Sequence, residues 1–224
     1  MTALTPSTSL TRMARWAGVL YLAIIVAGLG AELGVRARLI DLSDAGATAA
    51  AILSAPGLFR LGIAADLLMA LCDAGLAILL YAIFRPVAPI LALSALVFRL
   101  LQTALIAANL IALQTAWMLL TADGIDQAPA LALVFLDLHG HGYDLGLVFF
   151  GVNSLMTGAL IWRSGYFGRI FGAGLAAAGL VYLTGSVLRF FAPDLTDTFA
   201  PVYAITILAE TAFCLRLLLD RRRA

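Results

Sequence analysis

Six apolar runs, each long enough to cross a lipid bilayer, constrain this chain more than any other feature. Crossing about 30 Å of hydrocarbon takes about 20 residues of helix. The runs fall at about residues 14–33, 60–84, 90–120, 143–162, 169–191 and 201–219. Because lipid offers no partner for a free backbone group, a spanning segment must satisfy its own hydrogen bonds as a helix. The sequence therefore predicts an all-α polytopic membrane bundle of six transmembrane helices.

The composition excludes a soluble fold. Of 224 residues, 63% are hydrophobic and 12% are charged, whereas soluble domains carry about 25% charged residues. A soluble protein this apolar could not cover its own surface, so the expected partner is the lipid bilayer. The net charge of +1 excludes an electrostatic nucleic-acid binder.

The segments outside the runs predict the remaining organisation. Residues 1–11 are polar and expected to be a disordered tail, and residues 12–224 form a single bundle. After the first run, Ser43 can cap a short helix over 45–53 that stops at Pro56. After the third run, Pro129 opens a second short helix over 129–138, and a glycine-rich break over 139–142 follows it.

Arginine positions predict the orientation. Lys and Arg concentrate at the cytoplasmic ends of membrane helices. A cytoplasmic N-terminus places the following arginines on that side: Arg12, Arg15, Arg85, Arg163, Arg169, Arg216, Arg221, Arg222 and Arg223. Both termini are therefore expected in the cytoplasm, with the two short helices outside.

Three charged residues are expected near the bilayer midplane. At about 1.5 Å of rise per residue, Asp73, Arg99 and Glu210 all lie about 15 Å deep. Each costs on the order of 3 kcal/mol at that depth unless it has a partner or a water-filled cavity. Asp73 and Arg99 belong to antiparallel neighbours joined by a short turn, so they are expected to meet.

Two interpretations of this layer stay open. In the structural one, Asp73 and Arg99 hold two helices in register, and a neutral Glu210 hydrogen-bonds Gln102 or Asn153. In the functional one, two acids share one arginine, so one carboxyl group carries a proton or binds a ligand.

A second polar layer is expected near the outer surface. Glu32, Asp66 and Asn109 reach similar depths, and Arg36 and Arg60 lie within reach of Glu32 and Asp66. These residues either line a cavity open to the outer side or form ordinary interfacial salt bridges.

The most distinctive local sequence contains both histidines. His139 and His141 stand near Asp144 on the glycine-rich break, and alternate side chains of an extended segment can converge on zinc. This predicts a metal site at His139, His141 and Asp144. The competing interpretation is a helix entry in which His139 hydrogen-bonds the outer carboxylates.

Several motifs together resemble a bacterial membrane family, domain of unknown function 4386. They include Arg15-x-x-Gly18, Ala31-Glu32-Leu33, the segment from Leu58 to Asp66 with Cys72-Asp73, Phe98-Arg99-Leu100 and Leu136-Asp137-Leu138-His139-Gly140. The resemblance implies a multi-pass membrane protein without an assigned activity. We expect the protein in the bacterial cytoplasmic membrane, and the sequence predicts no cofactor apart from the zinc considered above. His141 and Gln102 depart from the family pattern.

Three functions remain open from the sequence. The first is a ligand- or proton-binding cavity open to the outer side, transporter-like or sensor-like, with candidates Asp73, Arg99, Glu210, Asp66, Glu32, Asn109 and His139. The second is a membrane-embedded metal-dependent enzyme using His139 and His141. The third is a structural or accessory subunit that contacts a second copy of itself or a partner membrane protein. A lipid-facing stripe of Gly and Ala on the fifth span would indicate this function.

Overall fold

The computed structural model describes residues 6–220, and these residues contain helices and turns but no strand. The helical elements are α1 (Pro6–Leu29), η1 (Gly30–Arg36), α2 (Ala37–Leu39), α3 (Ala45–Ser54), α4 (Pro56–Phe84), α5 (Pro89–Thr121), α6 (Ala128–Ser164), α7 (Arg169–Phe191), η2 (Pro193–Leu195), α8 (Thr196–Phe199), η3 (Ala200–Tyr203) and α9 (Ala204–Leu218). The predicted all-α class is confirmed.

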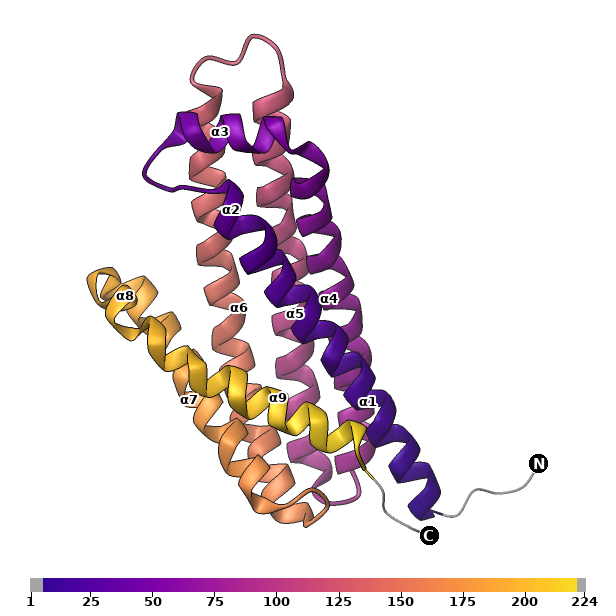
Figure 1. Cartoon of the computed structure of the whole chain (residues 1–224). Helices are drawn as coiled ribbons and strands as arrows, with labels where there is room; N and C mark the ends of the chain where they lie inside the picture. Colours follow the sequence, from indigo (N-terminus) through magenta and orange to yellow (C-terminus); the bar gives the residue numbers. More distant parts are fainter. Residues whose placement is uncertain (1–5, 221–224) are drawn as a thin grey trace, which may run out of the picture.

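Within residues 6–220, six helical segments are long and apolar enough to cross a membrane, which confirms the predicted number. They run over Ser9–Leu39, Pro56–Phe84, Pro89–Thr121, Ala128–Ser164, Arg169–Phe191 and Pro193–Leu218. The first span continues without interruption through the π-helix η1 into α2. The beginning of α1, the end of α9 and the α4–α5 turn lie at the same end of the bundle, as an even number of spans requires (Figure 1).

The first helix begins earlier than the sequence predicted. Of the expected disordered tail 1–11, residues 1–5 lie outside the described part, and the stretch from Pro6 onward already belongs to α1. The arginines at 221–223 also lie outside the described residues.

Helix α6 corrects the prediction for the third connection. Instead of a short helix, a break and a span, residues 128–164 form one continuous helix of 37 residues. Each mid-helix glycine costs roughly 1 kcal/mol relative to alanine, but Gly140 and Gly142 lie against the side chains of Arg189 and Asn109. Tertiary packing therefore overrides the local signal, and the two glycines are contact positions.

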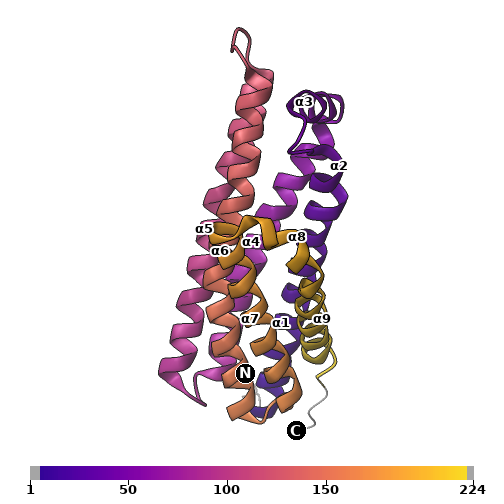
Figure 2. The same cartoon turned by 90° about the vertical axis from the view of Figure 1, so that its left-hand side faces the viewer.

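The α5–α6 hairpin is the longest part of the molecule. Helices of 33 and 37 residues extend about 50 and 56 Å, well beyond about 30 Å of hydrocarbon. Figure 2 shows this pair projecting past the other helices at the end that carries α3.

The short helix α3 is present, but a different residue caps it. The carboxylate of Asp44, not the hydroxyl of Ser43, accepts the hydrogen bond from the Ala47 amide (2.8 Å). Ser43 instead donates its backbone amide and hydroxyl to Asp41 Oδ1, at 2.9 and 2.6 Å. These hydrogen bonds lower the pKa of Asp41, because they stabilise its ionised form.

Replacing Asp44 by alanine is expected to loosen α3 by about 1 kcal/mol, because the Ala47 amide loses its partner. Hydrogen exchange of the first-turn amides of α3 should accelerate roughly fivefold. Ser43→Ala is the matched control, since its hydroxyl bonds only Asp41. Equal exchange in both variants would contradict this assignment of the cap.

Helices α6 and α7 pack with their backbones in close contact. A Cβ placed on Gly158 would lie 2.6 Å from the carbonyl oxygen of Gly172, and the reverse distance is also 2.6 Å. Gly151 and Gly179, each seven residues from the first pair, form a second such pair. There the distances from the added Cβ to the carbonyl oxygen of the partner glycine are 2.9 and 2.7 Å. Gly172 and Gly179 of α7 therefore allow close helix packing within the chain, as small residues commonly do between membrane helices.

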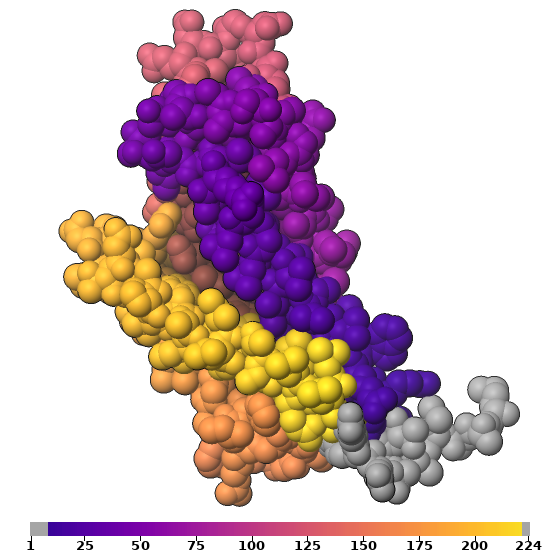
Figure 3. Space-filling model, viewed as in Figure 1, coloured from indigo at the N-terminus to yellow at the C-terminus, as the bar shows by residue number. Residues whose placement is uncertain are grey.

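Helices α1 and α9 cross at one end of the bundle and diverge toward the other. Figure 3 shows a recess between η1 and α1 on one side and α8 and α9 on the other, with α6 at its floor. The crossing point is well packed: Tyr21, Phe213 and Leu217 are almost fully buried there.

Candidate functional site

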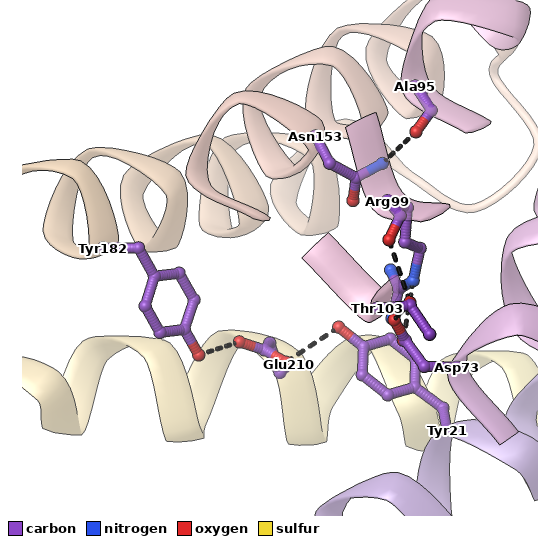
Figure 4. Close-up of polar contacts among 8 residues, drawn as sticks. All are labelled: Tyr21, Asp73, Ala95, Arg99, Thr103, Asn153, Tyr182 and Glu210. Atoms are coloured by element: carbon purple, nitrogen blue, oxygen red, sulfur yellow. Dashed lines mark hydrogen bonds and ion pairs between the residues drawn. The ribbon is translucent and has the colours of Figure 1, made fainter. Parts of the chain in front are cut away.

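The charged residues predicted at the midplane belong to one buried cluster to which every candidate span contributes. We call it the central cluster (Figure 4). It consists of Tyr21 from α1, Asp73 from α4, Arg99 and Thr103 from α5, Asn153 from α6, Tyr182 from α7 and Glu210 from α9. All except the half-buried Tyr182 are at most 9% exposed.

Asp73 and Arg99 meet as predicted. Arg99 donates Nε and Nη2 to Asp73 Oδ1, at 2.8 and 2.6 Å, and Thr103 donates its hydroxyl to Asp73 Oδ2 at 2.6 Å. The guanidinium carbon also lies 5.5 Å from the ring centre of Tyr21 and 5.1 Å from that of Phe150. Two aromatic faces therefore add cation–π attraction to a guanidinium that is 3% exposed.

Glu210 has different partners from those predicted. Tyr21 donates its hydroxyl to Oε2 at 3.1 Å, and Tyr182 donates to Oε1. Asn153 instead donates to the carbonyl of Ala95 at 2.7 Å, and Gln102 Oε1 has no hydrogen-bond partner. Glu210 therefore bonds Tyr21 and Tyr182 rather than Gln102 or Asn153, the partners that the structural interpretation gave it.

Sequence reasoning missed both tyrosines, although a signal for them existed. A phenol buried in a span carries a hydroxyl that usually needs a partner. Tyr21 and Tyr182 each stand in a span with no other strongly polar side chain at that level. A search for buried acceptors with no assigned donor would have matched them to Glu210.

The predicted second layer forms a separate cluster on η1, α4 and α6. We call Glu32, Arg36, Asp66, His139 and Tyr143 the second cluster. Arg36 donates Nε to Glu32 Oε2 at 2.7 Å and Nη1 to Asp66 Oδ2. The ring of His139 stacks on Tyr143 with centroids 6.3 Å apart. The π-helix turns Glu32 and Arg36 toward this position, and π-helical segments occur frequently at functional sites.

Two other predicted members of this layer lie elsewhere. Arg60 does not reach Asp66, because its guanidinium carbon lies 4.8 Å above the ring of Trp117. Asn109 donates Nδ2 to the carbonyl of His139 at 2.7 Å, beside Gly142. Asn109 therefore joins α5 to the backbone of α6 at His139.

The geometry does not support the predicted metal site at His139, His141 and Asp144. On the continuous helix α6, His139 and His141 are separated by a rotation of about 200° around the helix axis, so they lie on nearly opposite faces. His139 is buried, whereas His141 pairs locally with Asp137 (Nδ1 to Oδ1, 3.6 Å) and Asp144 pairs with Arg189 (3.5 Å). Within residues 6–220 no group of three or more metal-binding side chains gathers.

A small pocket adjoins the central cluster. Its lining includes the polar side chains of Arg99, Asn153 and Thr157 and the apolar side chains of Phe84 and Leu160. It has room for about one water molecule. Because it extends from Arg99 toward the α4–α5 turn, it lies on the opposite side of the cluster from the predicted outer cavity.

No curated protein and no solved structure matches this chain. A family match does exist, to the family described as Domain of unknown function (DUF4386), and it covers residues 16–220. This match includes the central cluster, the second cluster and all but the beginning of the first span. The chain therefore belongs to the DUF4386 family.

Proposed function

We propose that the protein binds an exchangeable proton in the central cluster, as part of a transporter-like or sensor-like activity in the bacterial cytoplasmic membrane. The observation that carries the proposal is a charge imbalance: Asp73 and Glu210 face a single cation, Arg99. An uncompensated charge is expensive in a membrane interior. One proton on the two carboxyl groups leaves the cluster neutral.

The surroundings of Glu210 suit the gain and loss of a proton. A phenol can donate a hydrogen bond to a carboxylate and accept one from a carboxylic acid. The hydroxyls of Tyr21 and Tyr182 each hold one oxygen of Glu210, so both charge states can keep hydrogen-bond partners. Arg99, in contrast, is fixed on Asp73 by two hydrogen bonds, which favours Glu210 as the group that exchanges.

Two features support access to the cluster. The pocket beside Arg99 and Asn153 extends toward the α4–α5 turn, the end that the arginine pattern assigns to the cytoplasm together with both termini. The recess between α1 and α9 opens toward the other end (Figure 3). In this proposal that recess is the cavity open to the outer side, and α3 lies outside the membrane.

The proposal predicts that Glu210→Gln takes up about one proton less per chain than the wild type. Purified protein in lipid nanodiscs would be moved from mildly alkaline to mildly acidic pH, with a pH-indicator dye counting the protons bound. Glu210→Asp, which keeps a carboxyl group, should retain the uptake. A folded Glu210→Gln variant that binds as many protons as the wild type would contradict the proposal.

A further inference from the structure

The second cluster differs from the central cluster in holding two buried polar atoms without partners. Asp66 is fully buried, and its Oδ2 bonds Arg36 while its Oδ1 has no hydrogen-bond partner among residues 6–220. His139 is 3% exposed, and its Nε2 has no hydrogen-bond partner in the described part of the chain either. Buried polar atoms are rarely left unpaired, and each unpaired atom in a native structure requires an explanation.

These two atoms belong to one neighbourhood. Arg36 bonds Asp66 directly, and Ala65, the residue before Asp66 on α4, belongs to the same packed apolar group as Tyr143 of α6. The ring of Tyr143 in turn stacks on that of His139. Both orphaned atoms therefore belong to side chains in the region where η1, α4 and α6 meet.

The charge of the neighbourhood favours a cation. Glu32 and Asp66 carry two negative charges and Arg36 one positive charge, which leaves a net charge of −1 with a neutral His139. Other arginines nearby are engaged elsewhere: Arg60 lies over Trp117, and Arg189 pairs with Asp137 and Asp144. An anion would meet a repulsive field here, and a cation an attractive one.

We propose that the second cluster binds an ammonium group, either the ammonium ion or the head of a small primary amine. Such a group offers several N–H donors, and the two orphaned atoms can both accept: Asp66 Oδ1, and His139 Nε2 in the tautomer protonated on Nδ1. The ring of Tyr143 adds a face for cation–π attraction. The ammonium ion is about as large as a water molecule, and the bordering elements η1 and α6 line the recess of Figure 3, through which an amine can enter.

This inference goes beyond the proton site and does not depend on it. Glu210 belongs to the central cluster and makes its hydrogen bonds to Tyr21 and Tyr182. The variant that removes the proposed proton site, Glu210→Gln, should therefore leave ammonium binding unchanged. The two proposals can fail separately.

The experiment titrates purified protein in nanodiscs with ammonium, methylammonium and potassium chloride and follows binding by calorimetry. Potassium matches ammonium in charge and approximate size but has no N–H donor. We expect ammonium and methylammonium to bind, and potassium to bind about 10- to 100-fold more weakly because it makes no hydrogen bonds. Asp66→Asn should weaken ammonium binding by a similar factor.

Three outcomes would overturn the proposal: no binding of either ammonium probe, equal binding of potassium, or unchanged affinity in Asp66→Asn. If Asp66→Asn does not fold, His139→Phe supplies the test, because it keeps an aromatic ring against Tyr143 and removes the accepting nitrogen. In that variant, unchanged ammonium affinity would equally contradict the proposal.

Discussion

Replacing Arg99 by methionine is expected to lower the free energy of unfolding by about 3–5 kcal/mol, the largest single effect in this protein. The substitution leaves the buried Asp73 carboxylate with only the hydroxyl of Thr103 as a donor. It also removes the cation between the rings of Tyr21 and Phe150. Unfolding by a denaturing detergent in mixed micelles, followed by circular dichroism, would measure the loss.

Two further variants separate the ion pair from the mere loss of an arginine. Arg60→Met removes an exposed arginine that lies over Trp117 and should change stability by no more than about 0.5 kcal/mol. The double variant Asp73→Leu with Arg99→Met removes both charges and should recover much of the lost stability, because no uncompensated charge remains. A double variant as unstable as the sum of its single changes would contradict a coupled pair.

The second large effect is expected where α6 and α7 touch. Gly158→Ala should destabilise the protein by about 1–3 kcal/mol, because the new methyl group would overlap the backbone carbonyl of Gly172 and neither helix can move without repacking. The same detergent unfolding assay measures it. This contact keeps α7, and with it Tyr182, in place against the rest of the bundle.

Gly57→Ala in α4 is the matched control, since nothing lies within 4 Å of a Cβ at that position. It should be neutral or stabilising by up to roughly 1 kcal/mol, because alanine has the higher helix propensity. If both glycine variants had the same effect, the close packing of α6 on α7 would not be what requires glycine at position 158.

The glycine pairs also bear on the accessory-subunit hypothesis. Its expected mark was a lipid-facing stripe of small residues on α7, but Gly172 and Gly179 face α6.

Much of the architecture could be predicted because lipid imposes strong rules on sequence. The length of each apolar run gave the number of spans, and the bounds of α7 coincide with the predicted run 169–191. The Asp73–Arg99 contact followed from the short α4–α5 turn and equal depths. These inferences use only rise per residue and chain connectivity, which do not depend on how distant helices pack.

The predictions that were wrong depend on packing between helices far apart in sequence. Nothing near His139 indicates that Arg189 and Asn109 fill the space over Gly140 and Gly142, so a break was expected where α6 continues. The partners of Glu210 come from α1 and α7, 189 and 28 residues away. Depth alone placed Asn153 and Gln102 equally close, and only the rotation of each helix decides which side chain faces Glu210.

The central cluster gives the bundle a reason to keep charges in an apolar interior. A lone ion pair joins two helices, whereas each of the six spans contributes at least one polar side chain to the central cluster (Figure 4). A change of charge at Glu210 would act on α1, α7 and α9 together through its two tyrosine contacts. The crossing of α1 and α9 also borders the recess, so proton binding and the width of that opening are expected to be linked.

The most direct test of the central claim is the infrared absorption of the protonated carboxyl group in the folded protein. Because Asp73 is paired with Arg99, we expect the wild type to show one such band from the membrane interior, and Glu210→Gln to lack it. Asp73→Asn should keep the carboxyl group of Glu210 but alter its charge state, since Arg99 then faces only one acid. A wild type with no protonated carboxyl band, or a band that persists unchanged in Glu210→Gln, would contradict the account.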